Sequence, residues 1–165
     1  MAGDLILHFV YPAPTALNDL RTVTIKQVPA EGGDEIELYK FSHPVTGTGV
    51  GVTTFQRQNF AVPRWETAGQ IEWVNNYNGY IYFGVERVAM RDVRRQKKST
   101  STSRRFKAGG NEFKWKIINE GEDLICVSAR GKTVALWTQS TQILKVVERV
   151  ENVLDRQAVS SIRPL

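Results

Sequence analysis

The chain has one cysteine, Cys126, and two histidines among its 165 residues. A single cysteine cannot form an internal disulfide, so a small fold held together by disulfides is excluded. His8 and His43 stand far apart and match no zinc-binding pattern, so we predict no metal site. Cys126 lies in the apolar run Leu-Ile-Cys-Val, which predicts an unreactive residue of the core.

Recognisable catalytic motifs are also missing. The sequence has no Gly-x-Ser-x-Gly, no P-loop, no His-Glu-x-x-His and no dinucleotide-binding pattern. The run from Gly47 to Gly51 alternates glycine with other residues, but no lysine or helical pattern follows it, so strand curvature explains it better than a phosphate loop. We therefore predict a protein that is not an enzyme, with no catalytic residues and no cofactor.

Long apolar runs are absent as well. The N-terminus has no basic region, and the apolar stretch Leu5–Tyr11 is interrupted by His8 and is too short for a signal peptide or a membrane span. This predicts a cytoplasmic or membrane-peripheral protein without either kind of segment. A hydrophobic content of 41% and a charged content of 24% are those of a globular protein, and the length predicts one domain over residues 1–165.

Short segments rich in β-branched and aromatic residues dominate the chain, and turns of glycine, proline and asparagine separate them. Their alternation predicts strands at 5–11, 21–28, 35–41, 48–56, 69–74, 80–90, 113–117, 124–128 and 133–137. Residues 142–150 complete the pattern as a last strand or the start of a helix. Such a series indicates an all-β fold, and we predict a single antiparallel β-barrel of about 10–12 strands because closure removes exposed sheet edges.

Only the C-terminal end has helical spacing. Its apolar residues recur at intervals of three or four: Val147, Val150, Leu154, Ala158, Ile162 and Leu165. The spacing predicts an amphipathic helix over about 151–163, ended by Pro164.

Positive charge is concentrated between Arg91 and Lys107. This segment holds eight of the 22 lysines and arginines but only one of the 17 acids, Asp92, so outside it 14 bases face 16 acids. The whole net charge of +5 therefore arises here. The segment also contains the Ser/Thr run 99–103, and we predict a mobile basic loop over about 91–107. After a Gly-Gly-Asn turn, apolar Phe113, Trp115 and Ile117 alternate with charged residues, which predicts a half-buried strand.

Three interpretations of this basic segment remain open. It is a solvated loop that only improves solubility, a surface for anionic membrane headgroups, or a nucleic-acid contact. Nucleic acid is the less favoured partner, because the nearby aromatics alternate as core residues instead of standing exposed as stacking platforms. The predicted anion- and lipid-binding residues are Arg94, Arg95, Lys97, Lys98, Arg104, Arg105 and Lys107.

Trp65 is the other candidate ligand-binding residue. It lies in Pro63-Arg64-Trp65-Glu66, which resembles a loop and not a strand. An exposed tryptophan there would stack on a sugar or enter an interface. A carbohydrate-binding module using Trp65 and the tyrosines at 77–82 is therefore an alternative, as is a protein-interaction or structural domain without a small-molecule ligand. The sequence does not determine the oligomeric state.

Two segments carry a family resemblance. The strand Gly69-Gln-Ile-Glu-Trp73 is followed, some thirty residues later, by Arg104-Arg105-Phe106, Gly110 and Glu112-Phe-Lys-Trp-Lys116. This arrangement resembles an uncharacterised fungal domain family related to the tubby C-terminal-like group, which includes plant LURP-one-related proteins and phospholipid scramblases. The resemblance covers about residues 20–165. It implies a β-barrel of twelve or nearly twelve strands around a C-terminal helix, and phosphoinositide binding at a basic surface.

One departure from that family concerns the C-terminal helix. In tubby-like folds this helix threads the barrel and is apolar nearly all round, whereas here it carries Asp155, Arg156 and Arg163. Burying such charges in a dry core costs several kcal/mol each. The helix is then partly enclosed, packs outside, or gives way to a strand. The lipid-binding residues of tubby do not map onto this chain, so none are transferred.

Overall fold

The computed structural model describes residues 4–12, 21–44, 51–75, 78–93, 95 and 100–147. These residues form twelve strands, one short α-helix and one 3-10 turn. In chain order they are β1 Leu5–Val10, β2 Val23–Val28, β3 Ile36–Ser42, β4 Gly51–Asn59, β5 Arg64–Trp73, β6 Gly79–Phe83, β7 Glu86–Ala89, α1 Met90–Val93, β8 Arg104–Ala108, β9 Asn111–Ile118, η1 Asn119–Gly121, β10 Asp123–Ser128, β11 Thr133–Thr138 and β12 Ile143–Val146.

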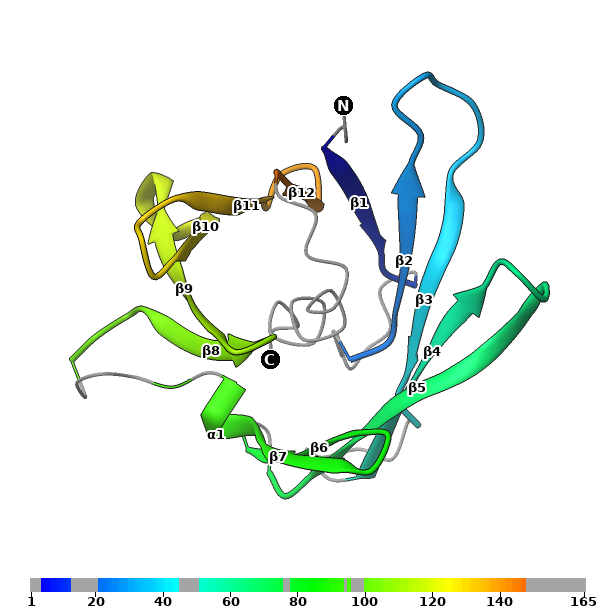
Figure 1. The fold of residues 1–165 in the computed structure, drawn as a ribbon, viewed down its shortest axis with the longest axis horizontal. Coiled ribbons are helices and arrows are strands. Elements are labelled where there is room, and N and C mark those ends of the chain that lie inside the picture. The colour runs from blue at the N-terminus through cyan, green and yellow to red at the C-terminus, as the bar shows by residue number, and fades with distance from the viewer. Residues whose placement is uncertain are drawn as a thin grey trace.

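All twelve strands belong to one antiparallel sheet. Its order is β7-β6-β5-β4-β3-β2-β1-β12-β11-β10-β9-β8, so β1 pairs with both β2 and β12 and joins the two halves of the chain. The sheet curves strongly, and α1 lies between its edge strands β7 and β8 (Figure 1). The all-β class and the number of strands are confirmed, while closure of the sheet into a barrel stays a prediction.

The core lies on the inner, concave face of this sheet. Alternation within each strand turns one set of side chains inward, for example Leu7 and Phe9 from β1 and Phe55 from β4, all at most 1% exposed. Phe41 and Phe55 stack with their ring centroids 5.1 Å apart. Register shifts at Ile25/Lys26, Phe55/Gln56 and Cys126/Val127 mark irregularities of the bulge type, which bend and twist strands.

Four expectations need correction. Residues 80–90 do not form one strand, because a Gly84-Val85 turn divides them into β6 and β7 and the chain then enters α1. Gly84 adopts a φ of 60° there, which a residue without a Cβ accommodates most easily. Trp65 lies in strand β5 and not in a loop, and β8 forms within the segment predicted as a mobile loop.

The fourth correction concerns Ile117. It was expected to share the buried face of Phe113 and Trp115 but is 46% exposed at the end of β9. The predicted C-terminal helix at 151–163 lies outside the described residues. Among those residues, we find no helix with the length and apolar character needed to cross a membrane.

Candidate anion-binding surface

The predicted binding residues on β8 of the β8–β9 hairpin do not all lie on the same face of the sheet. Phe106 and Ala108 are buried on the inner face of β8, so alternation places Arg105 and Lys107 on its outer face. On β9, Phe113 and Trp115 are buried, and Glu112, Lys114 and Lys116 alternate with them. Lys107 is opposite Glu112 in the register, and Arg105 is opposite Lys114. The outer face of the hairpin is therefore predominantly basic.

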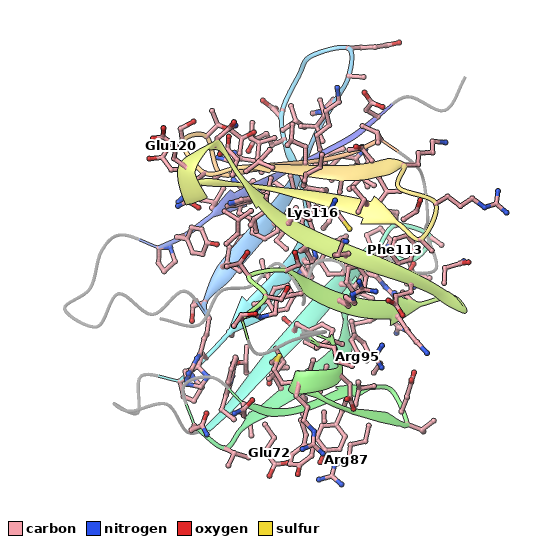
Figure 2. The ribbon with its side chains drawn as sticks, turned by 90° about the vertical axis from the view of Figure 1, so that its left-hand side faces the viewer. Glu72, Arg87, Arg95, Phe113, Lys116 and Glu120 are labelled. Carbon is pink, nitrogen blue, oxygen red and sulfur yellow. The ribbon has the colours of Figure 1, made fainter. Side chains whose placement is uncertain are left out.

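Arg95 joins this face through the backbone. Its N–H donates to the carbonyl of Arg105 at 2.8 Å, and the N–H of Arg105 donates back at 2.7 Å. This single bridge attaches the segment after α1 to the edge of β8. Figure 2 views the molecule from this side and labels Arg95 together with Phe113 and Lys116 of β9.

Glu112 is the carboxylate around which these cations gather. Arg105 Nη1 donates to Glu112 Oε1 at 2.7 Å, and Arg95 Nη2 lies 3.5 Å from Glu112 Oε2. We call Arg95, Arg105, Lys107 and Glu112 the Glu112 cluster. The hydrogen bond from Arg105, together with the charges of Arg105, Arg95 and Lys107, lowers the pKa of Glu112 below its ordinary value of 4.5. Glu112 is thus ionised at neutral pH, and three cations surround one anion.

The cluster has a net charge of +2 and remains accessible. The side chain of Arg95 is 51% exposed and that of Arg105 is 28% exposed, so an external group can approach both side chains. Guanidinium groups bind phosphate or carboxylate through paired N–H donors. An anion with several oxygens is the ligand that this arrangement suits.

The other predicted binding residues do not join this cluster. Arg104 occupies an inner-face position on β8, and its Nη1 donates to the backbone carbonyls of Ser101 at 3.0 Å and Ser103 at 3.2 Å. Arg104 therefore shapes the entry into β8. Arg94, Lys97 and Lys98 lie outside the described residues.

Trp65, the predicted ligand aromatic, is half-buried on β5. The ammonium of Lys40 lies 4.3 Å from the centre of its ring, a cation–π contact that occupies one face of the indole. Of the tyrosines expected to assist it, Tyr80 carries the guanidinium of Arg87 on its ring at 3.8 Å and Tyr82 donates to Glu72 at 3.2 Å. These contacts leave less ring surface for stacking on a sugar.

A second polar cluster, which the sequence did not reveal, lies on the inner side at one end of β2 to β5. We call Arg21, His43, Thr53 and Trp73 the inner polar cluster. Arg21 is 4% exposed and Thr53 is fully buried. The guanidinium carbon of Arg21 lies 4.0 Å from the centre of the Trp73 ring. Its Nη1 lies 3.5 Å from His43 Nε2.

The donor and acceptor roles in this cluster follow from its chemistry. Trp73 Nε1 can only donate, so Thr53 Oγ1 accepts its hydrogen at 2.8 Å. Arg21 also only donates, so His43 Nε2 accepts, and this assigns the ring proton to Nδ1, which donates to Thr53 Oγ1 at 2.8 Å. The residues come from four separate segments. Thr53 and Trp73 carried a signal, because they alternate with buried Phe55 and Ile71 on their own strands.

Cys126, the one cysteine of the chain, lies in the core. Cys126 is fully buried, as predicted for a core residue, and burial raises the pKa of its thiol to about 12. The thiolate needed for nucleophilic attack is therefore scarce at neutral pH. Within the residues that the structure describes, no group of three or more His, Cys, Asp or Glu side chains could hold a metal ion.

Comparisons with known proteins return no match. No family model matches the chain, and searches of curated proteins and of solved structures find no similar protein. The resemblance to the tubby-like group therefore stays a prediction. In this structure its motif residues have roles in the fold: Gly69 lies against β6, Trp73 belongs to the inner polar cluster, and Phe106 stacks on Phe113 with ring centroids 5.4 Å apart.

Proposed function

We propose that this chain is a non-enzymatic binding module that docks on anionic, phosphoinositide-type membrane headgroups through the Glu112 cluster and the basic segment around it. The observation that carries this proposal is the gathering of Arg95, Arg105 and Lys107 around a single carboxylate on the outer face of β8 and β9. A surface of this kind suits phosphate groups, since the arginines offer paired donors and excess positive charge remains.

The energetics favour a surface of many weak contacts. Each lysine or arginine near an anionic leaflet contributes about 1 kcal/mol, and clusters of four to eight are typical of phosphoinositide-binding segments. The segment 91–107 contains eight such residues. Cytoplasmic or membrane-peripheral localisation is part of the same proposal.

Vesicle sedimentation tests the proposal. Phosphatidylcholine vesicles are compared with vesicles that also contain a phosphoinositide, and with vesicles containing phosphatidylserine at equal total charge. We expect sedimentation with anionic vesicles only, and we expect raised salt to weaken it because exposed charges are screened. Stronger binding to the phosphoinositide than to phosphatidylserine would indicate headgroup recognition beyond charge.

Charge reversal identifies the surface. Arg95→Glu should weaken vesicle binding about tenfold, since it removes one positive charge and adds one negative charge. Lys26→Glu, on β2 and far from β8 in the sheet order, is the matched control and should change binding much less. Equal sedimentation of Arg95→Glu and the parent would defeat the proposal, as would tight binding to single-stranded RNA with none to vesicles.

A further inference from the structure

The turn between β4 and β5 presents apolar side chains to solvent. Phe60 is 58% exposed and Val62 is 53% exposed, and Ala61 and Pro63 beside them are also exposed. We call residues 59–64 the β4–β5 tip. β4 and β5 are the longest strands that the structure describes, and their hairpin projects from the right-hand end of the molecule in Figure 1. The tip is therefore a protrusion ending in two large apolar side chains.

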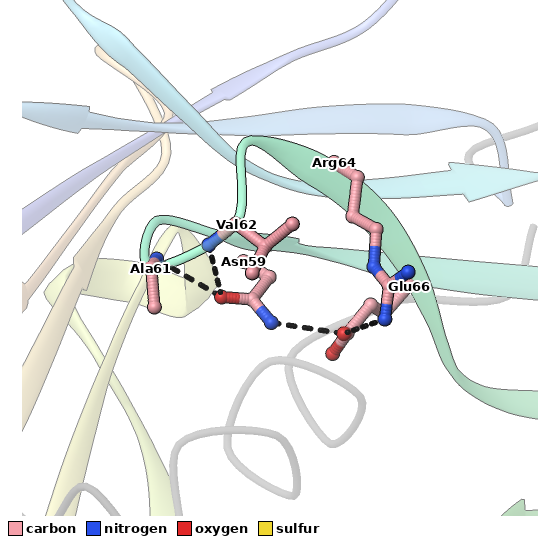
Figure 3. Close-up of polar contacts among 5 residues, drawn as sticks. All are labelled: Asn59, Ala61, Val62, Arg64 and Glu66. Carbon is pink, nitrogen blue, oxygen red and sulfur yellow. Dashed lines mark hydrogen bonds and ion pairs between the residues drawn. The ribbon is translucent and has the colours of Figure 1, made fainter.

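Polar contacts hold this tip in a defined shape (Figure 3). Asn59 Oδ1 accepts hydrogen bonds from the backbone N–H groups of Ala61 at 3.0 Å and Val62 at 3.2 Å. Asn59 Nδ2 donates to Glu66 Oε1 at 2.9 Å, and Arg64 Nη2 lies 3.4 Å from the same oxygen. The turn is thus tied to its own strands. Presenting Phe60 and Val62 costs little additional ordering when a partner binds.

Basic residues stand directly behind the apolar tip. Arg64 Nη2 lies 3.4 Å from Glu66 Oε1, and Arg57 is opposite Glu66 in the β4–β5 register, so both arginines lie near this one carboxylate. Counted along the strands, they stand within about 10 Å of Phe60 and Val62. Trp65 and Lys40 follow on the next positions of β5 and β3. With increasing distance from the end of the hairpin, the side chains are first apolar (Phe60 and Val62), then cationic (Arg57 and Arg64), and then the amphipathic ring of Trp65.

We propose that the β4–β5 tip inserts into the interfacial layer of an anionic lipid bilayer. Apolar segments at such interfaces bury to a depth of about 5–10 Å, which would bring Arg57 and Arg64 level with the headgroup phosphates. Tryptophan favours the same layer because its ring is apolar and its N–H is polar. A folded protein is the less suitable partner, since a specific interface buries about 800 Å² on each side and this convex tip offers only two large side chains.

This proposal is independent of the Glu112 cluster. The β4–β5 tip and the β8–β9 hairpin lie on opposite sides of the molecule in Figure 1. Each surface can therefore be tested while the other is left intact.

Fluorescence quenching by lipid tests the insertion. Trp73, Trp115 and Trp137 are at most 6% exposed, so Trp65 is the tryptophan that a quencher reaches. Vesicles of phosphatidylserine and phosphatidylcholine brominated on its acyl chains should quench part of the emission of the full chain. The Trp65→Phe variant should lose that quenching. Phe60→Ser/Val62→Ser should weaken vesicle association, measured by this quenching, about tenfold or more, because two side chains no longer enter the apolar layer.

Matched controls make the test decisive. Val85→Ser removes an even more exposed apolar side chain from the β6–β7 turn and should leave quenching unchanged. Arg95→Glu should not lower Trp65 quenching at saturating vesicle concentration, where weaker docking of the Glu112 cluster no longer limits binding, and this separates the present proposal from the one above. Absence of quenching in the parent protein overturns the insertion, as does quenching that persists in the Phe60→Ser/Val62→Ser variant. Self-association that this double variant abolishes would assign the tip to a second copy of the chain instead.

Discussion

Arg21 lies just before β2 and Arg105 lies on β8, and their guanidinium groups face different surroundings. Arg21 is 4% exposed, stacks on Trp73 at 4.0 Å and donates toward His43. Arg105 lies on the outer face and binds Glu112 at 2.7 Å beside two further cations. The inner arginine is buried against an aromatic ring and an imidazole from two other segments, whereas the outer one is bordered by solvent and by like charges.

The difference separates residues that hold the fold from residues that are available to a ligand. A buried polar group whose partner is removed keeps its full desolvation cost, so changes to the inner polar cluster should act on stability. An exposed ion pair contributes little to stability and is screened by salt. Changes to the Glu112 cluster should therefore act mainly on binding. The following predictions test this division, from the largest expected effect to the smallest.

Gly69→Ala should have the largest effect. A methyl group at this position of β5 would overlap the carbonyl oxygen of Tyr82 and the ring of Phe55, so β5 and β6 would have to separate on the inner side. We expect a loss of more than about 3 kcal/mol in the free energy of unfolding, measured by urea denaturation. Gly84→Ala is the control, because its Cβ would meet open space and only the φ of 60° would be strained. Equal stability of the two variants would contradict the close packing of β5 on β6.

Thr53→Val tests the inner polar cluster directly. The change keeps the volume but removes the oxygen that accepts hydrogens from Trp73 and His43. Leaving a buried indole N–H without its acceptor should lower the free energy of unfolding by about 1–3 kcal/mol.

The matched control is Thr54→Val, the next residue of β4, which is half-buried and alternates to the opposite face. It should cost much less in the same urea titration. If Thr53→Val is as stable as the parent, the inner cluster contributes packing and not hydrogen bonding.

Glu112→Gln should affect binding more than stability. It removes the only carboxylate of the Glu112 cluster and leaves the charges of Arg95, Arg105 and Lys107 less neutralised. Under the proposed function, affinity for anionic vesicles should rise about fivefold, since one opposing charge is removed from the surface. Glu31→Gln, in the exposed β2–β3 turn, makes the same change in net charge and should have a much smaller effect. Equal gains in both variants would show that net charge alone governs binding.

The smallest effect should be a pH dependence of stability below about pH 4.5. A side-chain hydrogen bond lowers the pKa of each of three carboxyls. Arg105 donates to Glu112, Asn59 donates to Glu66, and Asn119 donates to Asp123. A carboxyl whose pKa is lower in the folded than in the unfolded chain stabilises the fold above the unfolded value. It loses that contribution as pH falls through the folded value.

The melting temperature should therefore decline on acidification from pH 5 towards pH 3. The decline should be shallower in the Glu112→Gln variant, because one of the three carboxyls no longer titrates. A parallel decline in parent and variant would mean that the Arg105–Glu112 pair makes no difference to folding.

Most of the fold was predictable from local patterns. Alternation placed the strands around Phe9, Phe41, Phe113 and Trp137 correctly, since period-2 burial is a property of each strand by itself. The errors occurred where neighbouring elements decide the outcome. Val85 continued the alternation of residues 80–90, yet it lies in a turn because β7 returns antiparallel to β6.

The candidate site was predictable only in part. Charge counting identified Arg95, Arg105 and Lys107, but it could not show that Glu112 stands among them or that Arg104 turns inward. Those facts depend on the pairing of β8 with β9, which local charge does not encode. The sequence around Trp65 predicts a loop, whereas its place behind the β4–β5 tip follows from the long β4–β5 pairing.

The sequence by itself determined the all-β class, the buried face of most strands and the location of the excess positive charge, because hydrophobic alternation and net charge are local properties. The tertiary structure decided which distant residues meet. Arg21, His43, Thr53 and Trp73 form one cluster because β2 to β5 are neighbours in the sheet. Arg95 and Glu112 meet because the chain after α1 returns to the edge of β8. Such contacts between distant residues depend on strand order and register, which only the folded chain determines.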